Sequence, residues 1–332
     1  MKLRLVIGCR LTLLVLLIMG TPAWAEWKVE GEGNVFYTDD VALFSASQRL
    51  SLQEDPTQPV IDTTDQGDDV VFEPAISLGR SFQPSWGDVE LTVRAQGYVF
   101  ADHSEFNHGT YGAQITQALP AETLLRLRYH YGPNLFVGKN REKRTGNELL
   151  VEERVTTHFG TAELEHDVRE TLMVRLLGRY GHRSYNQVFK QRDTNFWTVG
   201  THAIWEIIPG VELVLGYHYE RTLADGRKRP ELEDDISSFI HYVVAELEVE
   251  VTEKTAVKLA FDFERTNYTT GIPDDERRDG SENIYQGEIE VRHAIHENID
   301  LLVAYLRGQR KFSFEDRQAI INTVWIGSAF RF

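Results

Sequence analysis

The sequence predicts an all-β fold, a transmembrane antiparallel β-barrel of about 14 strands that forms one domain. Three observations predict it: an export signal at the start, stretches that alternate apolar and polar residues, and short turns that alternate with long charged loops. The composition also argues against two other classes of protein. With 42% hydrophobic residues the chain is not disordered, and a formal net charge of −16 makes binding to nucleic acid unfavourable.

The chain begins with the three parts of a secretory signal peptide. The basic start contains Lys2, Arg4 and Arg10. An unbroken apolar run follows at 11–19, and 23–25 reads Ala-Trp-Ala, which fits an A-x-A cleavage site. The apolar run is shorter than the ~20 residues that a membrane-spanning helix needs. The sequence is therefore divided into a signal peptide, 1–25, and a β-barrel domain, 26–332.

The only cysteine, Cys9, lies within this signal. The exported protein is therefore expected to contain no disulfide and no thiolate metal site. A lipoprotein signal ending at Cys9 is the competing interpretation. It is disfavoured because the apolar core follows the cysteine instead of preceding it.

The first strands are predicted from a period of two in the apolar residues. An opening strand covers 27–37, and the strands 70–82 and 89–100 form a pair joined by the turn PSWGD. In the second member of this pair, valine, leucine and alanine share one face, while glutamate, threonine, arginine and glutamine share the other. The segment 41–69 is either a long first loop, which would fold inward as a plug or stay outside, or a strand extension followed by a loop.

The same unit recurs through the rest of the chain. The tight turns PAE, HDVRE, IPG, TEK and IHE each join two alternating stretches, and charged loops such as LADGRKRPELEDD separate the pairs. The even number of strands places both chain ends on the same side of the barrel. The further predicted strands are 109–119, 123–132, 154–165, 171–185, 195–207, 211–222, 237–251, 255–268, 283–294, 298–312 and 318–332.

Aromatic residues near the strand ends favour a membrane barrel over a soluble sandwich. Such residues form girdles at the two membrane interfaces of known barrels. The predicted girdle residues are Trp27, Trp86, Tyr98, Tyr129, Tyr131, Trp205, Tyr217, Tyr219, Trp325 and Phe330.

The closing residues INTVWIGSAFRF alternate up to a terminal aromatic residue, Phe332, with Phe330 two places before it. Together with the signal and the strand rhythm, this end resembles the bacterial outer-membrane β-barrel class, in which such a strand is the recognition signal of the assembly machinery. The resemblance implies periplasmic termini, a surrounding of Gram-negative outer-membrane lipid and lipopolysaccharide, and recognition of Phe330 and Phe332 by the barrel-assembly machinery. It identifies no particular family and leaves monomer and trimer open.

Charged residues that interleave with the apolar set are expected to line the lumen, because an arginine on the lipid face at the midplane costs ~2–4 kcal/mol. A basic wall is predicted on the third, fifth and seventh strands, and an acidic wall on the tenth to twelfth. The basic wall consists of Arg94, Arg126, Arg128, Arg175, Arg179 and Arg183. The acidic wall consists of Glu246, Glu248, Glu250, Asp262, Glu264, Glu288 and Glu290.

Facing walls of opposite charge would impose a transverse field on polar or charged solutes. The alternative is that these residues bridge a narrow lumen and fill it, and Lys258, Arg292 and Arg310 favour local pairing on the acidic side. The run LLVAYL at 301–306 is apolar on both faces. It predicts packing against an inward-folded loop or, alternatively, a patch for hydrophobic solutes.

Candidate catalytic and metal-binding groups are scattered. His182 and Ser184 share a strand face, and His103 and Ser104 adjoin in a loop, but neither pair belongs to a recognisable nucleophile motif. Three acidic clusters lack the alternating oxygen ligands of a calcium loop. They are 68–69, 234–235 and 274–276. We therefore expect no cofactor, no metal and no enzymatic activity.

The function that this sequence predicts is a passive channel or porin-like uptake protein for small polar or charged solutes. The main alternative is a non-conducting barrel with a structural or envelope-assembly role. A lipid-modifying outer-membrane enzyme is a more distant alternative.

Overall fold

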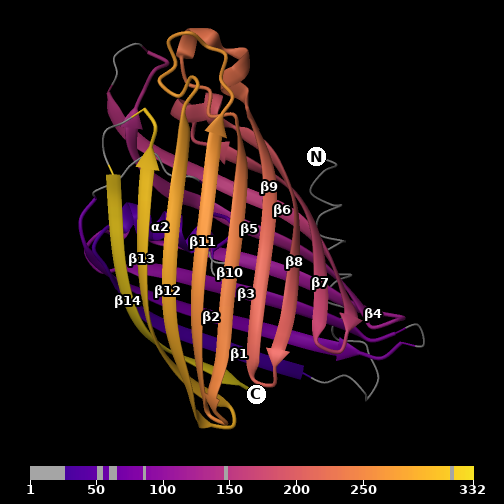
Figure 1. Cartoon of the computed structure of the whole chain (residues 1–332). Helices are drawn as coiled ribbons and strands as arrows, with labels where there is room; N and C mark the ends of the chain where they lie inside the picture. Colours follow the sequence, from indigo (N-terminus) through magenta and orange to yellow (C-terminus); the bar gives the residue numbers. More distant parts are fainter. Residues whose placement is uncertain (1–26, 51–54, 60–65, 85–86, 146–148, 315–317) are drawn as a thin grey trace, which may run out of the picture.

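A computed structural model describes residues 27–50, 55–59, 66–84, 87–145, 149–314 and 318–332 (Figure 1). The predicted signal peptide, 1–25, and the predicted girdle residue Trp86 lie outside the described residues. The described chain forms one sheet that closes on itself as an antiparallel barrel of 14 strands, so the predicted fold class is confirmed.

Each strand pairs with its neighbours in the sequence, and β1 pairs with β14 to close the barrel. The strands are β1 (Trp27–Thr38), β2 (Asp69–Phe82), β3 (Val89–Phe100), β4 (His108–Leu119), β5 (Thr123–Arg141), β6 (Leu150–Arg169), β7 (Leu172–Tyr185), β8 (Thr194–Ile208), β9 (Val211–Ala224), β10 (Ser238–Thr252), β11 (Thr255–Tyr268), β12 (Ser281–His296), β13 (Ile299–Phe312) and β14 (Gln318–Arg331). The helical segments are α2 (Val41–Leu50), η1 (Ser104–Phe106), η2 (Gln187–Arg192), η3 (Asp225–Lys228) and η4 (Pro230–Leu232).

One end of the barrel carries the short turns, and we call it the turn end. In the turn between β8 and β9, Gly210 adopts a φ of +78°, a left-handed conformation that glycine enters without steric cost. Between β4 and β5 the left-handed residues are Ala121 and Glu122, which reverse the chain after Pro120. The amide and carbonyl of Val29 each bond to Phe332 at 2.8 Å, so both ends of the barrel sequence meet here. Figure 1 shows the C-terminus beside these turns.

The opposite end, which we call the loop end, carries the long connections. The connections β7–β8 and β9–β10 contain η2 and the pair η3 and η4, and Figure 1 shows helical segments gathered above the strands. No helix in the described part of the chain is long and apolar enough to cross a membrane.

Apolar side chains cover the outer face of the barrel. Val93, Val199, Leu215, Val303 and Ile326 are each about half exposed, and each alternates with residues that face the lumen. This pattern matches a sheet with lipid outside and polar groups inside.

Six of the predicted girdle residues are exposed on the outer face: Trp27, Tyr129, Tyr131, Trp205, Tyr217 and Phe330. The prediction is wrong for Tyr98 and Trp325, which are buried inside the barrel. Both lie at positions of their strands whose side chains face the lumen. Tyr98 packs near Phe44 of α2, and Trp325 packs against Phe36 of β1.

Candidate functional site: the lumen and its constriction

The connection between β1 and β2 folds into the barrel. We call its described residues, 40–50 and 55–59, the inward segment. Asp40 begins α2 as an N-cap, because its Oδ1 accepts hydrogen bonds from the amides of Ala42 and Leu43 at 3.0 and 3.2 Å. The first turn of α2 is fully enclosed by the barrel. The described part of 41–69 therefore contains a helix, and the inward segment occupies part of the lumen.

Aromatic rings hold α2 against one side of the lumen. The Phe44 ring centroid lies 5.2 Å from that of Phe36 and 6.0 Å from that of Phe100. Ala304 and Leu306 of β13 belong to the same buried cluster. The lumen side of the run at 301–306 thus packs against the inward-folded loop, which is the first of the two arrangements that the sequence predicts for it.

The second part of the inward segment is fixed by polar contacts. Asp55 accepts hydrogen bonds from Thr57 and Gln58, and its Oδ2 lies 3.0 Å from Nε2 of His108 on β4. On the opposite side, Arg49 Nη2 donates to Glu264 Oε1 of β11 at 2.6 Å. The inward segment is therefore tied to both sides of the barrel.

All six residues of the predicted basic wall lie at lumen-facing positions of β3, β5 and β7. Three of them pair with two carboxylates of the adjacent strand β6, Glu163 and Glu165, which were not among the predicted site residues. Arg126 and Arg175 both contact Glu165, the second at 2.6 Å, and Arg128 lies 3.1 Å from Glu163.

The remaining members of the basic wall have weaker or different partners. Arg94 bonds to Glu32 of β1 at 2.9 Å, and Arg183 lies 3.6 Å from Glu220 of β9. Arg179 has no carboxylate within 4.0 Å among the described residues. The basic side therefore retains two arginines with little neutralisation.

The residues of the predicted acidic wall also lie at lumen-facing positions, on β10, β11 and β12. Lys258 bonds to Glu288 at 3.3 Å, and Arg292 bonds to Glu290 at 2.9 Å. Three acidic residues near the turn end have no ion pair among the described residues: Glu246, Glu248 and Glu250.

Pairing in the lumen therefore joins strands that are adjacent or separated by one strand. Apart from the inward segment, the ion pairs of the described walls do not cross the barrel, which differs from the predicted alternative of bridging across a narrow lumen. Arg310 follows the same rule, since it bonds to Glu282 on the adjacent β12. The sequence pattern also predicts lumen-facing positions for Glu163 and Glu165, because they alternate with Ala162 and Leu164.

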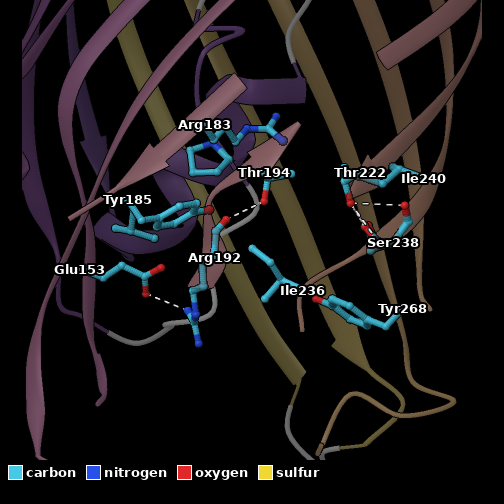
Figure 2. Close-up of a pocket in the computed structure, with 13 residues that line it drawn as sticks. Glu153, Arg183, Tyr185, Arg192, Thr194, Thr222, Ile236, Ser238, Ile240 and Tyr268 are labelled. Atoms are coloured by element: carbon cyan, nitrogen blue, oxygen red, sulfur yellow. Dashed lines mark hydrogen bonds and ion pairs between the residues drawn. The ribbon is translucent and has the colours of Figure 1, made fainter. Parts of the chain in front are cut away.

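Two cavities lie between the inward segment and the barrel wall, the outer one against β5 to β11 and the middle one against β7 to β11. The outer cavity is nearer the loop end, and Figure 2 shows Tyr185, Thr194, Ser238 and Tyr268 around it. The middle cavity is lined by Arg49, Pro56, Arg179, Arg183, Thr198, His218, Glu220, Ile240, Tyr242 and Glu264. Both cavities share Arg183 and Ile240, so they follow one another along the lumen.

Three loops are bound together above the outer cavity by a buried ionic network. Asp234 accepts hydrogen bonds from Arg192 Nε and Nη2 at 2.9 Å and lies 3.5 Å from Arg277 Nη1. Arg192 also bonds to Glu153 at 2.8 Å, as Figure 2 shows. Burial raises the pKa of Asp234, but the charges of Arg192 and Arg277 outweigh it and hold that pKa well below its usual range.

The candidate enzymatic pairs do not assemble. His182 Nδ1 lies 3.0 Å from Asn195 Oδ1, and His103 contacts Asp69. No serine–histidine hydrogen bond and no cluster of three or more metal-ligating side chains occurs in the described residues. Of the acidic loop clusters, Asp234 and Asp275 are engaged by Arg277, and Asp69 accepts amide hydrogen bonds from Ala101 and His103.

No protein-family model matches the chain, and no curated protein matches its sequence. Among solved structures, the outer membrane channel DcaP of Acinetobacter baumannii aligns with a TM-score of 0.56 and 11% identity over 93% of this chain and 97% of DcaP. The anion-selective porin of Comamonas acidovorans aligns with a TM-score of 0.48 and 10% identity, over 93% and 99% of the two chains. A loop-deletion variant of Vibrio cholerae OmpT gives 0.49 and 7%, over 93% and 100%. The DcaP alignment shows that the chain has the fold of an outer-membrane β-barrel.

Proposed function

We propose that this chain is a passive channel in the outer membrane of a Gram-negative bacterium and admits small polar or charged solutes. The observation that carries the proposal is the division of the barrel wall into an apolar outer face and a lumen lined by charged side chains around two consecutive cavities. Such a wall is stable only with lipid outside and water or solute inside.

The inward segment supports a selective channel over a wide pore. It fills one side of the lumen with an apolar cluster and presents Arg49 and Pro56 to the middle cavity on the other side. A solute entering from the loop end would pass the outer cavity and then the middle cavity. The geometry thus supports passage beside the segment, along β7 to β11.

We also propose a transverse electric field between the two walls, weaker than the sequence predicts because ion pairs neutralise part of the charge on each wall. Glu163 and Glu165 neutralise part of the charge of Arg126, Arg128 and Arg175, whereas Arg183 approaches its carboxylate only to 3.6 Å. The acidic residues Glu246, Glu248 and Glu250 near the turn end have no ion pair among the described residues. The solute would therefore meet positive charge in the middle cavity and negative charge near the turns.

The closing strand supports the predicted contact with the assembly machinery. Phe330 and Phe332 are exposed at the turn end, and their ring centroids lie 6.0 Å apart. Their exposure leaves both rings accessible to a partner before or during insertion. Loss of membrane assembly in Phe332→Ala, with unchanged refolding in detergent, would support this role.

Conductance tests the channel directly. The purified mature chain, inserted into a planar bilayer, is expected to give discrete current steps, and liposomes containing it are expected to swell in small sugars. The competing proposal is a non-conducting structural barrel, which the tight packing around α2 favours. A barrel that folds and inserts but gives no current above the lipid background would establish that alternative.

A further inference from the structure

We propose that Arg179 and Arg183 of β7 form a binding subsite for the carboxylate of a small organic monoanion. The proposal rests on the channel function and specifies the solute class that the middle cavity would hold. The two arginines lie on the same face of the strand, separated by Gly181, and both line the middle cavity.

The strands around Gly181 orient both guanidinium groups. Gly181 pairs with Phe159 of β6 on one side and with Phe196 of β8 on the other. The Cζ atom of Arg179 lies 4.7 Å from the Phe159 ring centroid, and that of Arg183 lies 4.1 Å from the Phe196 ring centroid. A guanidinium group packed over an aromatic ring keeps its N–H groups available at its edge for an anion.

The hydrogen bonds within the described residues leave donor capacity on both groups. Arg179 makes one hydrogen bond, from Nε to Thr161 Oγ1 at 3.4 Å, and Arg183 approaches Glu220 only to 3.6 Å. The Nε atom of Arg183 is buried without a hydrogen-bond partner. Arginine stays charged in proteins, and a desolvated charge is costly without a counter-ion, so this arrangement favours an anionic ligand.

The rest of the cavity indicates a single negative charge on the ligand. Its arginines are the β7 pair and Arg49, and its carboxylates are Glu220 and Glu264. Arg49 is already bonded to Glu264 at 2.6 Å. The three arginines and two glutamates of the cavity therefore leave one excess positive charge. One ligand carboxylate would neutralise this charge. A second ligand carboxylate would lie close to Glu220 or Glu264 and be repelled.

The test uses butyrate as the probe and butyramide as its neutral isostere, with the complete mature chain. Butyrate is expected to reduce the channel current saturably, and butyramide is expected to have no effect. In Arg179→Gln and Arg183→Gln the half-blocking concentration should rise about tenfold or more, the loss typical of a hydrogen bond to a charged group. Arg265→Gln removes the same charge from the exposed outer face of β11 and should change it less than about twofold.

Calorimetric titration of butyrate into the detergent-folded chain separates the two proposals. Saturable binding without any channel current would overturn the channel and retain the subsite. A conducting channel that neither binds nor is blocked by butyrate, or that responds equally in all three variants, would overturn the subsite and retain the channel. If a glutamine variant does not fold, Arg179→Lys keeps the charge but loses the planar fork, and it is expected to bind butyrate more weakly than the wild type. Unchanged binding in that variant would also contradict the subsite.

Discussion

Gly181 leaves space on the lumen face of β7 for the side chains of Phe159 and Phe196. A Cβ atom there would overlap Phe196 Cζ and would lie 2.5 Å from Phe159 Cβ, which is fixed to its backbone. Gly181→Ala is therefore expected to destabilise the folded barrel by about 1–3 kcal/mol. Urea unfolding in lipid vesicles measures the loss. Gly178→Ala is the control, because an added Cβ there has no atom within 4 Å. An equal change in both variants would show that ring packing at Gly181 is not the cause.

Asp234 links the stability of the loop end to pH. Its pKa is lowered in the folded protein, so its contribution is complete above the unfolded value of about 3.9 and is lost as the pH falls from there. Hydrogen exchange of the β9–β10 loop, corrected for intrinsic rates, is expected to show greater opening at pH 3 than at pH 7. Asp234→Asn should open the loop already at pH 7, by about 3–5 kcal/mol, because Arg192 and Arg277 stay buried with one partner fewer.

Asp225→Asn is the matched control for this prediction. Asp225 lies in the same loop and pairs with Lys228 at the surface, where an ion pair contributes about 0–1 kcal/mol. Its replacement is expected to leave both the exchange at pH 7 and its pH dependence unchanged. The network is not the cause of the pH effect if Asp234→Asn keeps the wild-type difference between pH 3 and pH 7.

Single residues show where sequence patterns suffice and where they do not. Tyr98 lies on the same strand face as Arg94 and Gln96, so the period of two places it in the lumen, and its nearness to a strand end does not make it a girdle residue. Arg126 has a carboxylate partner, whereas Arg179 has none among the described residues. The sequence around each arginine does not predict this difference. It depends on which side chains the neighbouring strands bring alongside, and thus on the register of three strands.

At the scale of elements, all 14 strands were predictable because a period of two with one apolar face is typical of a half-buried strand and not of a helix. The extra length of β5, which runs to Arg141, was missed where Pro133 and glycines interrupt the alternation. The helix α2 was also missed. Its apolar residues are buried against aromatic side chains of distant strands, so the reason for its position lies in the closed barrel and not in its own sequence.

Removal of the inward segment tests what it does to the pore. Thr38 and Asp69 are paired in register, so deletion of 41–66 leaves Asp39, Asp40, Gly67 and Asp68 as a four-residue connection. The shortened chain is expected to close into the same barrel and to give a larger single-channel conductance, because the lumen loses the material that narrows it. Planar-bilayer recordings and swelling in larger sugars measure this. Unchanged conductance in a correctly folded variant would show that the segment does not limit the pore.

At the scale of the whole molecule, the lumen is polarised along its length as well as across it. Arg179 and Arg183 lie in the middle cavity, whereas the acidic cluster of Glu246, Glu248 and Glu250 lies towards the turn end with no ion pair among the described residues. A solute that crosses the barrel therefore meets opposite fields in sequence. Charge at a pore mouth changes the local concentration of ions, and the effect is screened by salt within about 10 Å at 0.1 M.

Neutralising this acidic cluster is expected to change ion selectivity without changing the barrel. The triple variant Glu246→Gln, Glu248→Gln, Glu250→Gln removes three negative charges from the turn-end mouth, so cations lose their enrichment there. The reversal potential in a KCl gradient should shift towards anion preference, more at low salt than at 1 M, where the screening length falls to about 3 Å. The control neutralises three exposed acids of the loop end, Asp102, Glu105 and Glu231. The same shift in both triple variants would mean that net charge sets the selectivity, and a constant reversal potential would mean that the mouth does not contribute to it.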